Sequence, residues 1–116
     1  IYRNGKWDLP KGHLKKGERP EFGGMREVQE ECGVDKLEVV EHLANTFHMY
    51  ERKGMVLKKT FWYIMRTDFS GELIPQLEEG ITEVAWKTKP EIKNLLKKSY
   101  PIIGELLKKG VKRINQ

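Results

Sequence analysis

Three glutamates, Glu27, Glu30 and Glu31, fall within five consecutive positions of a segment with a helical pattern. At about 100° per residue, their side chains share roughly one quadrant of the helix surface. Like charges at this spacing repel by a few tenths of a kcal/mol, and carboxylates in a last turn oppose the helix dipole by about 0.3–1 kcal/mol each. A hard divalent cation, which prefers oxygen ligands, would reverse the sign of that free energy. By itself the cluster is more typical of a solvated acidic face, so its surroundings have to distinguish the two interpretations.

A basic loop, "PKGHLKKGER" at residues 10–19, precedes the acidic segment. Its cationic side chains could hold phosphate groups, and they are Lys11, His13, Lys15, Lys16 and Arg19. We predict that Lys11 and His13 bind substrate. The alternative for each residue of the loop is a purely solubilising role.

Two further candidates for substrate binding come from the extended segments that follow. Lys59 is one, with Lys58 as the alternative, because the alternation of the strand allows either side chain to face a cleft. Tyr50 is the other, as an aromatic ring that could stack on a base; Phe47 and Tyr63 are alternatives.

Zinc and disulfide chemistry are not expected. His42 and His48 have no second His or Cys at metal-ligand spacing. Cys32 is the single cysteine of the chain, which excludes an internal disulfide and fits a reducing compartment, so we expect a cytoplasmic protein. Its place on the apolar side of the predicted helix favours a buried thiol over a nucleophile.

The composition bounds the class of protein. The chain has 116 residues, enough for one domain with a real core, and 22 Lys+Arg against 17 Asp+Glu give a formal net charge of +5. This excess favours an anionic partner, although basic surfaces are also common for solubility alone. No apolar run approaches the length of a membrane span. Nucleic-acid binding is a weaker alternative, because the lysines of the C-terminal segment fit the solvated face of a helix that covers a sheet.

The elements that position these residues can be placed from turn signals and periodicity. We predict a strand pair in residues 1–9, a helix over 20–32 with Gly33 as its left-handed cap, long strands at 37–50 and 55–67, a loop at 68–80, a short strand at 81–87, and helix from Pro90 onward that Pro101 divides. Both faces of 55–67 carry apolar residues, which predicts an inner strand. The three tryptophans, Trp7, Trp62 and Trp86, are expected mostly in the core. Strands flanked by helical segments indicate an α/β or α+β domain with a mixed sheet covered on both sides.

The glutamates are part of a longer pattern. Gly12 is followed after five residues by Glu18, and after seven more by "REVQEECGV" at 26–34. This spacing resembles the Nudix box, and every defining position matches. "WDLPKGH" before it and "EEGITEVAWK" after it are also similar to Nudix sequences, so the resemblance covers most of the chain.

The resemblance implies a Nudix-type α/β/α sandwich, with residues 1–116 forming a single domain. Ile1-Tyr2-Arg3 reads as the end of a strand, so we expect one or two strands of the fold to precede it. The implied activity is hydrolysis of a nucleoside diphosphate linked to another moiety, with Mg²⁺ or Mn²⁺ as cofactor. The expected substrate is a phosphorylated small molecule, and we expect no nucleic-acid or membrane partner and a monomer or homodimer.

The resemblance also carries roles to individual residues. Glu27, Glu30 and Glu31 would be the metal ligands, helped by the backbone carbonyl of Gly12. Glu27 or a carboxylate outside the box would be the general base, while Arg26 would pair with Glu18 and brace the loop. The outside acid is predicted to be Glu79, with Glu78 as the alternative and Glu83 as a third candidate.

The alternatives concern substrate and class. Dinucleoside polyphosphates and nucleoside triphosphates are the favoured substrates, while diphosphoinositol polyphosphates and nucleotide sugars stay open. A regulatory module with the same fold but no catalysis is a second class, and the complete set of box glutamates argues against it.

Overall fold

The computed structural model describes residues 1–114. Its elements, in chain order, are β1 (Tyr2–Arg3), β2 (Lys6–Trp7), α1 (Pro20–Cys32), β3 (Leu37–Glu51), β4 (Met55–Thr67), the 3₁₀ turn η1 (Leu77–Glu79), β5 (Ile81–Glu83), α2 (Lys89–Leu95), the 3₁₀ turn η2 (Leu96–Lys98) and α3 (Pro101–Ile114).

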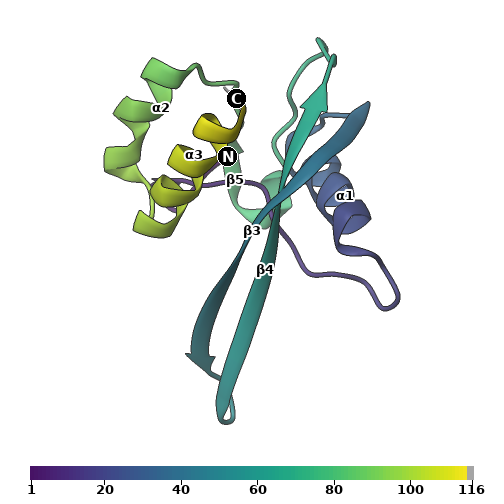
Figure 1. Ribbon diagram of the computed structural model, residues 1–116, viewed down its shortest axis with the longest axis vertical. Coiled ribbons are helices and arrows are strands. Elements are labelled where there is room, and N and C mark those ends of the chain that lie inside the picture. The colour runs from purple at the N-terminus through teal and green to yellow at the C-terminus, as the bar shows by residue number, and fades with distance from the viewer. Residues whose placement is uncertain (115–116) are drawn as a thin grey trace.

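The long hairpin of β3 and β4 forms the middle layer, with α1 on one side and α2 and α3 on the other (Figure 1). Helix α1 packs against β4 and β3, and α3 packs against β3. The hairpin tip extends beyond both helical layers (Figure 1). The expected α/β class and the layered sandwich are therefore confirmed.

The strands form two sheets, and both are antiparallel. One has the order β2-β1-β5, and the other consists of β3 and β4 alone. Within residues 1–114, parallel pairing is confined to a single bridge between Trp7 and Ser99. Among the described residues, this parallel bridge is the only part of the expected mixed sheet that is present.

Two features of the sheets differ from expectation. Within residues 1–114, strand β4 pairs with β3 alone, so the prediction of an inner strand is wrong. Its faces are apolar on both sides because helices cover both, with Met65 near Gly24 of α1 and Trp62 packed with Ile103 of α3. Strand β5 ends at Glu83, four residues earlier than predicted.

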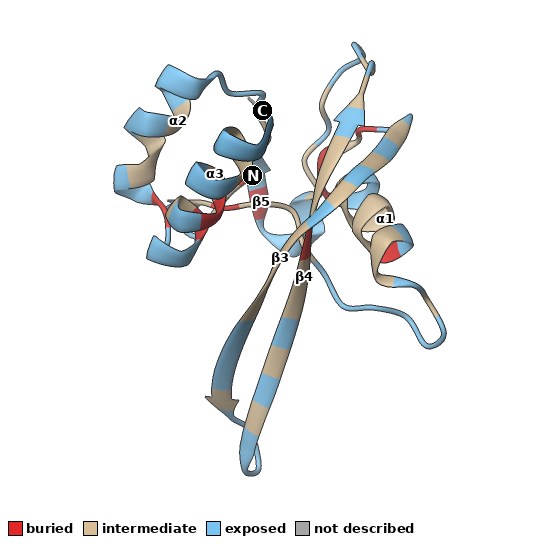
Figure 2. Cartoon of the chain, viewed as in Figure 1, coloured by how far each residue is buried: buried red, intermediate tan, exposed pale blue. Residues whose placement is uncertain are grey.

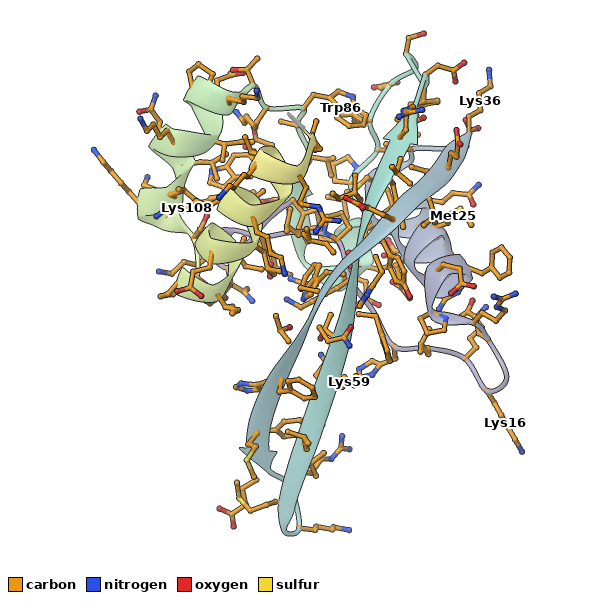
Figure 3. All side chains as sticks on the ribbon, in the orientation of Figure 1. Lys16, Met25, Lys36, Lys59, Trp86 and Lys108 are labelled. Atoms are coloured by element: carbon orange, nitrogen blue, oxygen red, sulfur yellow. The ribbon has the colours of Figure 1, made fainter. Side chains whose placement is uncertain are left out.

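Two small clusters of buried residues hold the layers together (Figure 2). The first contains Ile1, Cys32, Val34 and Ile81. The second contains Trp62, Ile103 and Leu106. Cys32 is buried as expected, whereas Trp86 is 60% exposed, because the chain has left the sheet before it (Figure 3). The prediction of a core position is therefore wrong for Trp86.

The C-terminal helices follow the predicted division at proline. Helix α2 begins with a capping box in which Thr88 and Glu91 bind each other's backbone N–H, and Pro101 starts α3. Among residues 1–114, no helix combines the length and the apolar character that a membrane span requires.

Candidate active site

Helix α1 carries the acidic cluster, and its two ends are fixed by local sequence. Pro20 occupies the first turn, where its missing N–H is no loss. Gly33 ends the helix with φ 73°, and its N–H donates to the carbonyl of Gln29 at 2.9 Å. The helix thereby stops directly after Glu31 and Cys32, and the chain turns away from the carboxylates.

Arg26 lies at the centre of the cluster and joins the helix to the loop before it. Its Nε and Nη2 donate to the two oxygens of Glu18 at 2.8 and 2.9 Å, and Nη2 also donates to the carbonyl of His13 at 2.9 Å. The guanidinium holds the pKa of Glu18 at about 2, well below its usual value. The pairing of Arg26 with Glu18 that the Nudix box implied is present in the structure.

The same guanidinium also contacts two of the candidate metal ligands. Its Nη1 donates to Glu27 at 2.7 Å and to the two oxygens of Glu30 at 3.3 and 3.2 Å. Arg26 therefore offsets much of the repulsion that the sequence indicates. With the carboxylates held this way, no group of three His, Cys, Asp or Glu side chains within 1–114 is arranged to hold a metal ion.

Glu31 is in a different environment from its neighbours. It is 3% exposed, and it accepts a hydrogen bond from the backbone N–H of Lys11 at 3.2 Å. Burial raises the pKa of this carboxyl to about 7. A carboxyl with this pKa is poised to change its protonation state near neutral pH.

Gly12 passes close against Glu27. A Cβ at position 12 would overlap the Glu27 carboxylate, so any larger residue there would displace that carboxylate from its present position. Gly23 is used in a similar way, since a Cβ there would overlap Leu14 and lie 3.0 Å from a Glu18 oxygen. These contacts explain why two positions that weaken a loop and a helix are occupied by glycine.

A cavity of about 310 Å³ collects most of the predicted site residues. Its lining residues are Arg3, Lys11, Gly12, His13, Glu27, Glu30, Glu31, Lys58, Gln76 and Glu79. The acidic residues come from α1 and η1, and the basic ones from β1, the loop before α1, and β4. Of the three carboxylates considered outside the box, Glu79 lines this cavity, and Glu78 and Glu83 do not.

Two of the predicted substrate residues lie elsewhere. Lys59 lines a neighbouring cavity of about 200 Å³, and its Nζ lies over the ring of Phe61 at 4.8 Å (Figure 3). Lys58 lines both cavities. Tyr50 pairs with Val56 near the hairpin tip and stacks on His48, away from the carboxylates.

Sequence reasoning missed three contributors. Asp8, 9% exposed, accepts an ion pair from Lys11 Nζ at 2.9 Å, so the Lys11 ammonium is already engaged on its own loop. Arg3 donates to the carbonyl of Glu79 at 3.5 Å, and Gln76 donates its N–H to the carbonyl of Glu31 at 3.1 Å. The i,i+3 spacing of Asp8 and Lys11 is a signal that could have been used, whereas the contacts of Arg3 and Gln76 depend on the tertiary fold.

The fold and the site together define a layered α/β domain with an acidic cleft rimmed by cations. Among known families, the model described as the NUDIX domain matches residues 1–109. The chain belongs to the Nudix family.

Individual relatives show how far the similarity extends. The putative mutator protein MutT4 of Mycobacterium tuberculosis is 35% identical over 80 residues, which is 69% of this chain and 32% of the relative. Nudix hydrolase 25 of Arabidopsis thaliana is 44% identical over 41 residues, 35% of this chain and 23% of the relative. The RNA pyrophosphohydrolase of Nitratiruptor sp. is 33% identical over 57 residues, 49% of this chain and 36% of the relative. The chain therefore spans about a quarter to a third of these relatives.

Solved structures extend the likeness to almost the whole chain. A binary complex of the Ap4A hydrolase of C. elegans superposes with a TM-score of 0.73 at 24% identity, covering 98% of this chain and 80% of that one. A second structure of the same hydrolase gives a TM-score of 0.66, with 98% and 81% covered. At this identity the likeness shows the fold.

Proposed function

We propose that residues 1–116 form one catalytic domain that hydrolyses a phosphoanhydride bond of a nucleoside diphosphate derivative. The observation that carries the proposal is the cavity that places Glu27, Glu30, Glu31 and Glu79 opposite cationic side chains. An acidic floor suits a divalent cation, and the cations suit the phosphates of its substrate.

The chemistry of the donor set fits the cofactor that the family implies, and Glu27 and Glu30 would have to leave Arg26 to bind it. Carboxylate oxygens of Glu27, Glu30 and Glu31 and the carbonyl of Gly12 are hard oxygen ligands, which Mg²⁺ prefers and Mn²⁺ accepts. When bound, such a cation neutralises phosphoryl charge and lowers the pKa of a bound water. These four residues are the proposed ligands.

The chain's own residues would orient the substrate and take up a proton. Glu27 or Glu79 would accept the proton of the attacking water through a carboxylate oxygen, and Arg26 would hold the loop and helix in register. Arg3, His13 and Lys58 would bind phosphate oxygens, with Lys11 joining them where its pair with Asp8 opens. Lys59 and Phe61 line the neighbouring cavity, which shares Lys58 with the carboxylate cavity and would receive a nucleoside.

The cations favour a highly charged substrate, so we propose a dinucleoside polyphosphate or a nucleoside triphosphate. The names of two relatives, an Ap4A hydrolase and an RNA pyrophosphohydrolase, are consistent with a substrate of this kind. A diphosphoinositol polyphosphate and a nucleotide sugar are the competing classes.

A substrate panel tests the proposal. The protein is incubated, with and without Mg²⁺, with Ap4A, ATP, a 5′-triphosphorylated RNA, a nucleotide sugar and a diphosphoinositol polyphosphate. Products are separated by chromatography, and ¹⁸O-labelled water identifies the phosphorus attacked. We expect turnover only with the cation and fastest with Ap4A or ATP.

Matched variants assign the activity to the cavity. Glu27→Gln and Glu30→Gln should each lower kcat by about 10²-fold or more, because each removes a charged ligand of the reacting centre. Glu21→Gln is the control, since Glu21 lies on the same helix but pairs with Arg19 outside the cavity. Near-wild-type, metal-dependent turnover in both cavity variants would contradict the assignment.

A further inference from the structure

The positive charge of the chain is concentrated in its C-terminal helices. Residues 87–114 contain nine of the 22 Lys+Arg and two of the 17 Asp+Glu. The rest of the chain therefore carries thirteen basic and fifteen acidic residues and is slightly negative. The excess that makes the protein basic lies on one part of the fold, apart from the carboxylate cavity.

Helices α2 and α3, with η2 between them, enclose an open groove of about 550 Å³. Its aliphatic floor consists of the half-buried Ile92, Leu96, Leu107 and Val111, and the exposed Pro90 also lines the groove. Its sides carry lysines: Lys89 and Lys93 from α2, and Lys108 and Lys112 from α3. The carboxylate cavity shares none of these residues.

The spacing of these residues makes the groove a trough along the helices. Ile92 and Leu96 are four residues apart, and so are Leu107 and Val111, which places successive floor residues about one helical turn, roughly 6 Å along the axis, from each other. The flanking pair Lys108 and Lys112 has the same spacing. An apolar stripe is thus bordered by cations along its length.

Three of the flanking lysines have no partner among the described residues. Lys93, Lys108 and Lys112 are exposed, and their side chains make no hydrogen bond, ion pair or ring contact within 1–114 (Lys108 is labelled in Figure 3). Arg113 at the end of α3, in contrast, pairs with Glu41 of β3. Lys93, Lys108 and Lys112 are therefore available to a bound molecule.

We propose that this groove docks an acidic amphipathic helix of a partner protein. A ridge of apolar side chains at i, i+4 and i+7 would lie on the aliphatic floor, and glutamates or aspartates beside that ridge would face the lysines of both walls.

The shape and chemistry of the groove favour this partner over other anionic ones. A nucleic acid would find no aromatic side chain on the floor for base stacking. A bilayer accepts apolar groups that protrude from a surface, whereas these lie at the bottom of a concavity between two helices.

The test uses a designed peptide of about eighteen residues, long enough to form a helix, with leucines at i, i+4, i+7 and i+11 and glutamates beside them. A scrambled peptide of the same composition is the first control. Binding to the full chain is measured by fluorescence anisotropy, and chemical-shift changes locate the bound peptide. We expect the amphipathic peptide to bind with shifts in α2 and α3, and the scrambled one to bind at least about tenfold more weakly.

Two triple variants that change the net charge equally distinguish binding in the groove from attraction to the net charge of the protein. Lys93→Glu, Lys108→Glu and Lys112→Glu together should raise the Kd at least about tenfold. Lys97→Glu and Lys98→Glu in η2 together with Lys109→Glu in α3, all three outside the groove, should change it by less than about threefold. All six lysines are exposed, so both variants should fold, which circular dichroism checks.

Three results would overturn the proposal. One is equal weakening by both triple variants, which would mean attraction to net charge alone. Another is equal binding of the scrambled peptide. The third is binding of phosphatidylserine vesicles or single-stranded RNA that depends on the groove lysines, without binding of the amphipathic peptide.

Discussion

A single guanidinium connects three of the carboxylates at the candidate active site. Arg26 donates to Glu18, Glu27 and Glu30, and its contact with the carbonyl of His13 attaches the preceding loop. The carboxylate cluster is thus tolerated through an internal cation, at a position where the sequence alone suggests repulsion. Since bidentate pairing to Glu18 involves Nε and Nη2, the remaining nitrogen, Nη1, is shared between the two candidate metal ligands.

The pair of Glu18 and Arg26 predicts a specific loss of stability in acid. The pKa of Glu18 is about 2 in the fold, against an ordinary value of 4.5. Because the folded pKa is the lower one, the contribution is complete above pH 4.5 and disappears as the pH falls toward 2. The free energy of unfolding from denaturant titrations should therefore differ between wild type and Glu18→Gln at pH 7, and the difference should shrink between pH 4.5 and 2.

The control for this series is Glu105→Gln, an exposed carboxylate of α3, which lies on the other side of the hairpin from α1 (Figure 1). It should leave the pH dependence unchanged. A Glu18→Gln difference that stays constant from pH 7 to pH 2 would show that the ion pair is not the source of the effect.

At the scale of the element, local sequence signals predicted most of the boundaries. Pro20 and Gly33 set the ends of α1, and Pro101 sets the start of α3, because each residue restricts or frees the backbone at its own position. The pairing of β4 and the exposure of Trp86 could not be predicted this way. Both depend on which elements cover a strand in the folded chain, and an apolar face looks the same whether a helix or another strand covers it.

The same division applies to the candidate site. The spacing of Gly12, Glu18 and the helix identified the residues of the loop and α1, because they are close along the chain. Lys58 lines the carboxylate cavity, whereas Lys59 was the predicted residue. Which of the two lines the cavity depends on the face of β4 that is turned toward it, and the alternation of the strand allowed either face. Arg3 enters from β1 by a contact 76 residues apart in sequence, which no local signal could indicate.

A substitution at Gly33 should lower stability in two ways, through the left-handed backbone and through a clash with Ile74, and a matched variant can separate them. Gly33→Ala places a Cβ at φ 73°, 2.9 Å from the Ile74 Cβ and 3.0 Å from its backbone nitrogen. We expect the free energy of unfolding to fall by about 2–4 kcal/mol, from left-handed strain and from displacement of the 73–79 loop.

Gly17→Ala is the matched control, because Gly17 has φ 77° with nothing within 4 Å of a Cβ. It should cost about 1 kcal/mol in the same denaturant titration, from the backbone alone. Equal losses in the two variants would show that the contact with Ile74 contributes nothing.

At the scale of the whole molecule, the cavity is assembled from segments that are distant along the chain. Ile74 donates to the carbonyl of Cys32 at 2.8 Å and Gln76 to that of Glu31 at 3.1 Å, so the end of α1 holds the loop that positions Glu79. The basic groove lies on the helices of the other layer (Figure 1). The acidic and basic surfaces are thereby separated. Since the cavity forms only on folding, a cation that binds its carboxylates would be bound only by the folded chain.

Because folding assembles the carboxylate cavity, we predict that Mg²⁺ stabilises the fold. A ligand that binds only the folded state adds RT ln(1 + [L]/Kd), about 2.7 kcal/mol at a hundredfold excess over Kd. This gain is reduced by the free energy of the ion pairs that Glu27 and Glu30 give up when they leave Arg26. The rise in Tm therefore reports how much more strongly these carboxylates bind Mg²⁺ than the Arg26 guanidinium. Thermal unfolding followed by circular dichroism, at constant ionic strength set with KCl, should show a higher Tm with Mg²⁺ for wild type and for Glu21→Gln. The rise should shrink in Glu27→Gln and Glu30→Gln, since each removes a charged ligand. If wild type shows no rise at saturating Mg²⁺, or if the variants show the full rise, the carboxylates of α1 are not the metal site.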